Sequence, residues 1–269
     1  MRLSLFAPID RWLAPAPQPG RIDWLRGASF AHRGLHGGGL HEGAGPPENS
    51  LSAFAMAMTH GLGIECDVQL TADGEAVVFH DFTLGRLTGG DGAVIDLTAA
   101  ALSAIAFKGA AETIPGLRTM LAAVGGRVPL LIELKSRAHW PIARLCGAVQ
   151  RALAGYRGAH AVMSFDPRAP AWFARHAPAT ARGLIVSEEH RHGPRYAFQR
   201  HLALWRARPD FLAYDIRDLP SPFAALQRQR GVPVASWTVR SPALLARAHT
   251  HADAPIAEGT GVPPAVTAP

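Results

Sequence analysis

Short apolar segments with the character of strands alternate with segments of helical periodicity along most of this 269-residue chain. The clearest strand candidate is 128–135, VPLLIELK, a nearly continuous apolar run that is expected of a strand buried on both faces. Strands that alternate with helices form parallel βαβ units. The chain is therefore predicted to be an α/β protein with a parallel sheet.

Eight main strands are predicted, which is the number that closes a TIM barrel, and the chain has a suitable length for one. They begin at residues 28, 63, 76, 128, 160, 182, 210 and 233. Helices are predicted at 48–61, 97–106, 116–124, 140–154, 168–176, 195–206, 221–229 and 242–249. We expect a single (β/α)8 barrel over 26–269, preceded by a Pro-rich arm at 1–25 that lies on its surface.

One part of this strand pattern is irregular. No helix separates the predicted strands 63–70 and 76–81, and a short ninth strand candidate lies at 255–257. Either the crossover between the two strands is irregular or the ninth segment closes the barrel. The sequence leaves both alternatives open.

The composition excludes several classes of function. The net charge is +6, but the basic residues are scattered and no basic patch with interleaved aromatics is visible, so no nucleic-acid binding is expected. No apolar run reaches 18 residues and the N-terminus lacks the apolar region of a signal peptide. We therefore predict a cytoplasmic protein without stable membrane insertion, and its two cysteines, Cys66 and Cys146, are expected to be reduced and buried.

Polar residues stand on the predicted strands near the ends where a barrel collects its catalytic groups. Glu65 and Asp67 are two residues apart, as are Glu133 and Lys135, so each pair shares one face of its strand. Three carboxylates facing one cavity would repel one another and would be costly to bury, and a divalent cation removes both problems. Oxygen ligands favour Mg²⁺ or Ca²⁺ over zinc. The alternative is a set of buried ion pairs with Arg33 and Lys135.

Two histidines, His32 and His80, end neighbouring predicted strands. A pair of imidazoles beside a bound cation is suited to phosphoryl chemistry, with one acting as general acid and the other as general base. Arg33 and Lys135 could hold phosphate oxygens. Lys135 is one of only two lysines among 27 basic residues, and Asn49 is the only asparagine, so both are candidates for specific roles.

Seven short motifs, taken in order, resemble those of the glycerophosphodiester phosphodiesterase family. They are His-Arg-Gly at 32–34, Pro-Glu-Asn-Ser at 47–50, Glu-Cys-Asp-Val-Gln-Leu-Thr-Ala-Asp-Gly at 65–74, Val-Phe-His-Asp at 78–81, Glu-Leu-Lys at 133–135, Ser-Phe at 164–165 and Trp-Thr-Val at 237–239. Each motif alone is weak, but their order and spacing over about 30 to 240 are specific.

The resemblance implies a barrel of the phospholipase C-like phosphodiesterase type that hydrolyses glycerophosphodiesters to an alcohol and glycerol 3-phosphate. It implies metal ligands at Glu65, Asp67 and Glu133, and an acid–base pair at His32 and His80. It also implies that Arg33, Glu48 and Lys135 surround the phosphate and the metal. The expected partner is a small-molecule glycerophosphodiester.

The chain departs from the family pattern at three places. A Gly-rich stretch at 36–46 is longer than expected and brings His36, His41 and Glu42 close to the site, as a flexible flap or as a lid. Arg240 follows Trp-Thr-Val where the family usually has Asn, and 255–260 replaces the usual Thr-Asp-x-Pro segment. These changes leave the alcohol side of the pocket and the exact substrate open.

Three aromatic residues near predicted strand ends also need an assignment. Trp237 could form the floor of a glycerol pocket or fill the core, whereas Phe165 and Tyr214 are expected in the core.

Two other functions stay open at this stage. One is a phospholipase C- or D-like enzyme that acts on intact lipids, and the other is a barrel that binds phosphoryl ligands without catalysis. The head group, the choice between Mg²⁺ and Ca²⁺, the individual roles of the two histidines and the oligomeric state are not predicted.

Overall fold

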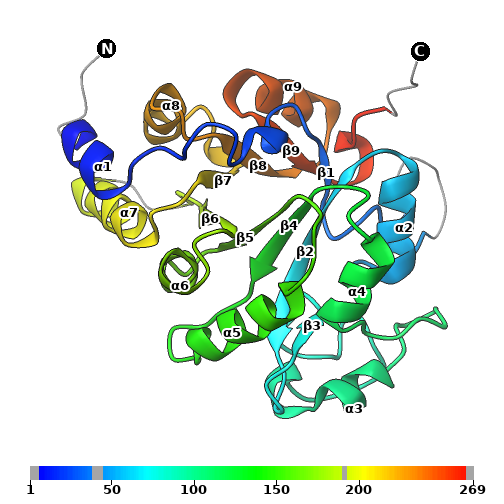
Figure 1. The fold of residues 1–269 in the computed structure, drawn as a ribbon. Helices are drawn as coiled ribbons and strands as arrows, with labels where there is room; N and C mark the ends of the chain where they lie inside the picture. Colours follow the sequence, from blue (N-terminus) through cyan, green and yellow to red (C-terminus); the bar gives the residue numbers. More distant parts are fainter. Residues whose placement is uncertain (1–5, 38–44, 190–192, 265–269) are drawn as a thin grey trace.

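Eight parallel strands close into a barrel in the computed structural model, which describes residues 6–37, 45–189 and 193–264 (Figure 1). The barrel strands are β1 (Phe30–Ala31), β2 (Gly63–Leu70), β4 (Leu130–Leu134), β5 (His160–Ser164), β6 (Ala181–Val186), β7 (Phe211–Asp215), β8 (Val234–Val239) and β9 (Ala254–Ala257). The barrel closes because β1 pairs with β2 on one side and with β9 on the other. The predicted TIM barrel is thus confirmed.

The ninth strand candidate is the one that closes the barrel. β3 (Ala76–Val78) pairs antiparallel with β2 and lies outside the parallel ring, so 76–81 is not one of the eight barrel strands. Because β3 runs antiparallel to β2, the C-terminal end of β3 lies beside the middle of β2, where the Phe79 N–H donates to the Asp67 carbonyl. His80 follows Phe79 and therefore lies beside the acidic residues of β2.

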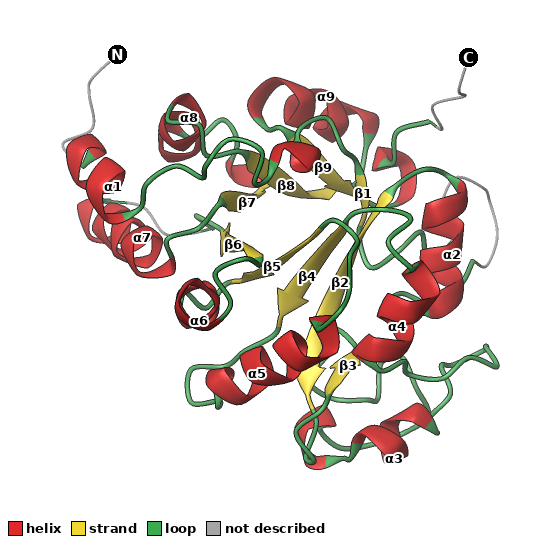
Figure 2. Ribbon diagram, in the orientation of Figure 1, coloured by secondary structure: helices red, strands yellow, loops and turns green. Residues whose placement is uncertain are grey.

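Helices surround the barrel on its outer side, as the colouring of Figure 2 shows. They are α1 (Ala7–Leu13), α2 (Leu51–Thr59), α3 (Ala99–Ser103), α4 (Leu117–Val124), α5 (Ile142–Leu153), α6 (Arg168–His176), α7 (Pro194–Ala207), α8 (Pro222–Gln229) and α9 (Pro242–His251). Serine hydroxyls cap several of them at the N-terminus: Ser50 accepts from the Ala53 N–H at α2, and Ser241 from the Leu244 N–H at α9. No helix of the described ranges is both long and apolar enough to span a bilayer.

The barrel interior changes from apolar to polar along its axis. Phe30 and Leu131 are buried inside the ring, and the Phe30 side chain fits only because its neighbour across β2 is Gly63, where a Cβ would lie 2.5 Å from the ring. Glu65 lies two residues after Gly63 on β2, and Glu133 lies two residues after Leu131 on β4, so both side chains face inward as well. A packed apolar floor thus lies beneath a polar layer at the C-terminal ends of the strands.

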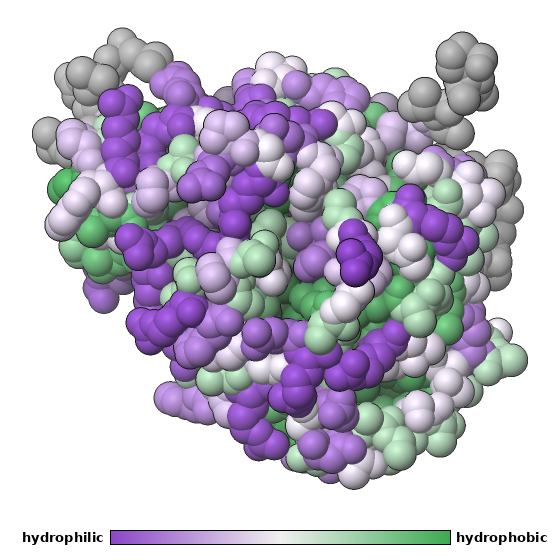
Figure 3. Space-filling model, viewed as in Figure 1, coloured by the Kyte–Doolittle hydropathy of each residue, from purple (hydrophilic) through white to green (hydrophobic). Residues whose placement is uncertain are grey.

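Figure 3 shows hydrophilic residues over much of the visible face, with apolar residues exposed between them.

The N-terminal segment contains a helix, α1, which was not anticipated. Asp10 of α1 is fully buried, and its carboxylate accepts hydrogen bonds from the imidazole of His201 (2.8 Å), the indole of Trp205 (2.7 Å) and the amide of Gln227 (3.0 Å). These contacts join α1 to α7 and α8.

Replacing Asp10 by alanine should lower the free energy of unfolding by about 3 kcal/mol, because the buried partners lose their acceptor. Burial raises the pKa of Asp10, but the hydrogen bonds from His201, Trp205 and Gln227 outweigh it and lower that pKa. The stabilisation is therefore present above the ordinary value of 3.8 and is lost as the pH falls below it. Urea unfolding of Asp10→Ala at neutral and acid pH, beside the exposed control Asp91→Ala, measures both effects. Equal stability of the two variants at neutral pH would contradict the prediction.

Candidate active site

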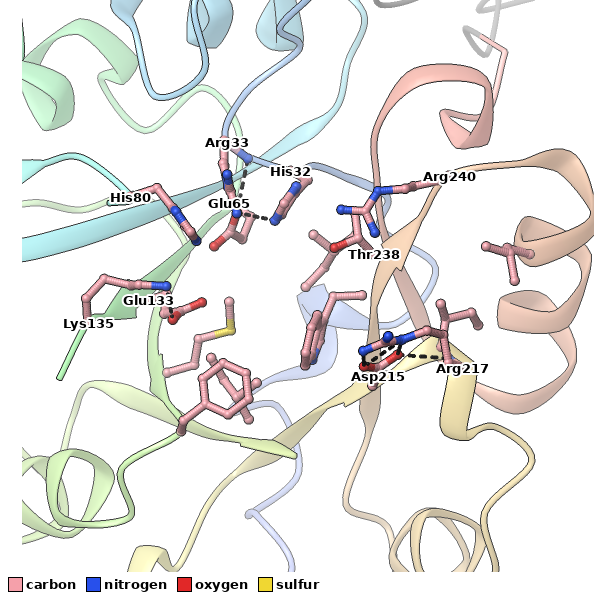
Figure 4. Close-up of a pocket in the computed structure, with 17 residues that line it drawn as sticks. His32, Arg33, Glu65, His80, Glu133, Lys135, Asp215, Arg217, Thr238 and Arg240 are labelled. Atoms are coloured by element: carbon pink, nitrogen blue, oxygen red, sulfur yellow. Dashed lines mark hydrogen bonds and ion pairs between the residues drawn. The ribbon is translucent and has the colours of Figure 1, made fainter. Parts of the chain in front are cut away.

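One cavity of about 580 Å³ opens at the C-terminal ends of the barrel strands. One side carries His32, Arg33, Glu65, His80, Glu133 and Lys135, and the other carries Asp215, Arg217, Thr238 and Arg240 (Figure 4). Most of the first group gathers because β1, β2 and β4 are neighbours in the barrel and run parallel, so their polar ends meet at one edge, whereas His80 follows β3, which pairs with β2. The cavity volume is typical of sites for small molecules.

Three carboxylates converge beside this cavity. Oxygen atoms of Glu65, Asp67 and Glu133 all lie within 4.8 Å of one another, and Asp67 is directly opposite Glu133 in the pairing of β2 with β4. Burial and the charges of Asp67 and Glu133 raise the pKa of Glu65 well above its usual range. Burial likewise raises the pKa of Glu133. The three carboxylates do not ionise together easily because their charges repel one another. A divalent cation removes this repulsion, and oxygen ligands suit such a cation.

The ion pairs that the sequence offered as an alternative are also present. The Lys135 ammonium lies 3.0 Å from Glu133 and 3.5 Å from Asp67, and the Arg33 Nε lies 3.3 Å from Asp67. Although burial raises it, the pKa of Asp67 falls to about 2 because the charges of Lys135 and Arg33 prevail. Glu65 is relieved less than Asp67: among the described residues it accepts the backbone N–H of Arg33 at 3.0 Å and lies 4.0 Å from the His32 Nε2, and its pKa stays raised. Two cations, Arg33 and Lys135, thus face three carboxylates, and a divalent cation would let all three ionise together.

Asn49, the only asparagine, holds Asp67 of this cluster in place through hydrogen bonds. Its φ of +59° lies in the left-handed region, which Asn tolerates better than most residues. The Asn49 side-chain nitrogen donates to Asp67 Oδ2 (3.0 Å), and the Asn49 side-chain oxygen accepts from the Asp67 backbone N–H (3.2 Å). Asn49 thus holds Asp67 through Oδ2, while Oδ1 lies 3.5 Å from the Lys135 ammonium.

Each of the two histidines is held by a carboxylate at Nδ1. His32 Nδ1 lies 2.5 Å from Glu258 Oε2, and His80 Nδ1 lies 2.7 Å from Asp81 Oδ1. An ionised carboxylate at Nδ1 selects the tautomer that carries the proton on that nitrogen, so Nε2 is left with a lone pair for chemistry. Figure 4 shows both rings directed toward the space around Glu65.

Glu258 is a site residue that the sequence reasoning missed. It follows β9, and Arg240, the residue that departs from the family pattern, donates its Nε to Glu258 Oε1 at 2.6 Å. Burial raises the pKa of Glu258, but the hydrogen bond with His32 and the nearby His36 imidazole prevail and hold that pKa far below the usual range. The available signal was a carboxylate that directly follows the predicted strand 255–257.

The long Gly-rich stretch at 36–46 is only partly described by the structure. His36 lies with its Nε2 3.6 Å from Glu258 Oε2. His41 and Glu42 lie outside the described residues, and so does most of the segment for which a flap or a lid was expected.

Glu48 lies behind Arg33 and is not among the residues that line the cavity. Its carboxylate accepts from the Arg33 guanidinium at 2.8 Å and from the Arg86 guanidinium at 2.7 and 3.0 Å. Arg86 in turn binds Asp81, the partner of His80. Sequence reasoning missed Arg86, which links Glu48 to Asp81.

The apolar part of the cavity contains aromatic side chains. Trp237 lines the cavity and also packs on the barrel interior, with its indole N–H donating to the Ala213 carbonyl at 3.0 Å. Tyr214 is fully buried, as expected. The expectation that Phe165 belongs to the core is wrong: it is 49% exposed and lines the cavity edge-on to Trp237. Phe165 directly follows the last residue of β5, so its side chain lies beyond the packed barrel interior.

Several known proteins resemble this chain. Residues 32–265 match the glycerophosphoryl diester phosphodiesterase family. A glycerophosphodiester phosphodiesterase from Caldanaerobacter subterraneus subsp. tengcongensis is 42% identical over 115 residues, which are 40% of this chain and 44% of that protein. Human glycerophosphodiester phosphodiesterase 1 is 34% identical over 135 residues, which are 46% and 40% of the two chains. The matched segments thus span less than half of these relatives.

Solved structures share the fold. A phosphodiesterase from Oleispira antarctica in complex with the product sn-glycerol-3-phosphate superposes with a TM-score of 0.74 at 24% identity, over 86% of this chain and 93% of that one. A glycerophosphodiester phosphodiesterase from Thermotoga maritima gives a TM-score of 0.67 at 24% identity, over 86% and 94%. The family match includes all eight cavity-facing strand ends, and the chain therefore belongs to the glycerophosphoryl diester phosphodiesterase family.

Proposed function

We propose that this protein hydrolyses glycerophosphodiesters to an alcohol and glycerol 3-phosphate. The observation that carries the proposal is one cavity in which two carboxylate-held imidazoles, His32 and His80, flank an acidic cluster. The names of the sequence relatives support this activity, and so does the glycerol 3-phosphate bound in the structural neighbour from Oleispira antarctica.

Glu65, Asp67 and Glu133 would hold the divalent cation, and their oxygen-only chemistry favours Mg²⁺ or Ca²⁺. When bound, the cation would neutralise charge on the phosphate and polarise its P–O bonds. The Lys135 ammonium lies at the edge of the same cluster and would contact a phosphate oxygen from the side opposite His32.

The two histidines would move protons at Nε2. One takes a proton from the nucleophile, which is either water or the 2-hydroxyl of the glycerol by way of a cyclic phosphate. The other gives a proton to the oxygen of the leaving alcohol. Arg33 would face the phosphate, and Glu48 would hold the Arg33 guanidinium in place through their hydrogen bond. Trp237 would form an apolar wall for the carbon skeleton of the substrate.

Glu258 is proposed as a positioning residue that acts through His32. Replacing it by alanine should lower kcat at least about tenfold, because His32 loses the acceptor that fixes its ring and tautomer. KM should change little, since Glu258 does not line the cavity. Glu258→Asp should recover part of kcat. A Glu258→Ala variant with wild-type kcat, or one altered only in KM, would contradict this role.

An assay with glycerophosphocholine tests the function as a whole. Release of choline and glycerol 3-phosphate that stops with EDTA and returns with Mg²⁺ or Ca²⁺ is the expected result. Hydrolysis of intact phosphatidylcholine vesicles but not of glycerophosphocholine would instead favour the lipid-cleaving alternative. Binding of glycerol 3-phosphate without turnover of any diester would favour the non-catalytic one. The cytoplasmic location stays a prediction from the sequence.

A further inference from the structure

We propose that His32, His36 and Glu258 form a second metal site, suited to Zn²⁺, beside the carboxylate cluster. One ligand atom from each of the three side chains lies within 4.8 Å of the other two. Glu258 Oε2 is the shared neighbour, 2.5 Å from His32 Nδ1 and 3.6 Å from His36 Nε2.

An unsatisfied nitrogen supports this site. His36 Nε2 is buried and has no hydrogen-bond partner among the residues that the structure describes. A buried polar atom without a partner is costly, and a metal ion at this position would satisfy it. Glu258 is already prepared as a ligand, because Arg240 binds its Oε1 and directs Oε2 toward the two imidazoles. A hydrogen-bonded carboxylate of this kind is typical of the surroundings of metal ligands.

The ligand types separate the two metal sites. Two imidazoles and one carboxylate are preferred by Zn²⁺, and three protein ligands leave a fourth tetrahedral position for water. The cluster of Glu65, Asp67 and Glu133 offers oxygen only and suits Mg²⁺ or Ca²⁺. His32 lies between the sites, with Nδ1 toward Glu258 and Nε2 4.0 Å from Glu65.

The consequence for activity rests on the proposed function. As general acid or as general base, His32 must carry protons on both ring nitrogens at one stage of each turnover. Zn²⁺ on Nδ1 occupies one of these nitrogens and displaces Glu258 from it. Zn²⁺ therefore inhibits the enzyme even when the carboxylate cluster holds Mg²⁺.

Direct binding tests the site without any assay of activity. Calorimetric titration of the full chain with Zn²⁺, in excess Mg²⁺, should show one site whose affinity falls more than about tenfold in His36→Ala and in Glu258→Gln. The matched control His249→Ala, an exposed histidine of α9, and Glu65→Gln should keep that affinity. Co²⁺ in place of Zn²⁺ should give the strong visible absorption of a tetrahedral site, and His36→Ala should lose it. Equal Zn²⁺ affinity in wild type and His36→Ala would overturn the proposal.

Activity gives an independent readout. The Mg²⁺-loaded wild type should lose diester hydrolysis on addition of micromolar Zn²⁺, whereas the activity of His36→Ala, relative to its own value without Zn²⁺, should not fall. Absence of any hydrolysis would refute the proposed function but would leave the binding result standing. Inhibition that is equal in wild type and His36→Ala would place the inhibitory ion elsewhere and would overturn this site.

Discussion

Glu65→Gln should lower kcat/KM for glycerophosphocholine at least about a thousandfold, because a cation ligand contributes several kcal/mol to stabilising the charged transition state. The same variant should lose the thermal stabilisation that Mg²⁺ or Ca²⁺ gives the wild type, which is about 2.7 kcal/mol at a hundredfold excess over Kd. Assays and thermal unfolding with and without the cation measure the two effects on one protein.

Stability without metal separates loss of the ligand from misfolding. Burial beside Asp67 and Glu133 raises the pKa of Glu65, so a neutral amide at this position removes a charge that the metal-free cluster disfavours. The metal-free variant should therefore unfold at the temperature of the metal-free wild type or above it. Glu75→Gln, at an exposed position in the turn before β3, is the matched control and should change nothing. Unchanged sensitivity of Glu65→Gln to a chelator, with activity retained, would refute the ligand assignment.

His32→Ala and His80→Ala should each lower kcat at least about a hundredfold, the usual contribution of general acid–base catalysis. Both variants should still show the Mg²⁺-induced rise in unfolding temperature, because neither imidazole belongs to the oxygen cluster. The exposed histidine His139 offers a control in His139→Ala, which should be fully active. Wild-type kcat in either site variant would remove that histidine from the mechanism.

A substrate with an activated leaving group assigns the two roles. A nitrophenyl phosphodiester needs little protonation of its leaving oxygen, so the variant that lacks the general acid should regain most of its activity on it, and the variant that lacks the base should not. Each histidine has a carboxylate at Nδ1, so this contact does not distinguish the two roles. Recovery in both variants would show that neither acts as the base.

The fold was predictable where local patterns were strong. The strand 63–70 has the boundaries that its sequence indicated, and helix 168–176 does as well. The segment 76–81 could not be assigned, because its apolar residues fit a strand inside the ring or one paired at its edge equally well. Pairing between β1 and β9, which lie more than 200 residues apart, decided the matter. Helix α1 was missed because its stability depends on the burial of Asp10 against α7 and α8 rather than on its own seven residues.

The site was predictable only in part. Spacing placed Glu65 and Asp67 on one face of a strand, and the structure brings both to Glu133. Glu258 was missed because it reaches His32 across 226 residues, and no local pattern reports such a contact. Phe165 was misplaced because an apolar residue at a strand end can turn either into the core or toward the cavity.

The sequence by itself determined the alternation of strands and helices, the polar layer at the strand ends and the resemblance to one family, because these depend on residue type and on spacing within single segments. Tertiary structure alone decided which strand closes the barrel, which carboxylate holds His32 and how far Glu65 resists ionisation. Those properties depend on distances between residues that are remote in the chain, and only the closed barrel sets these distances.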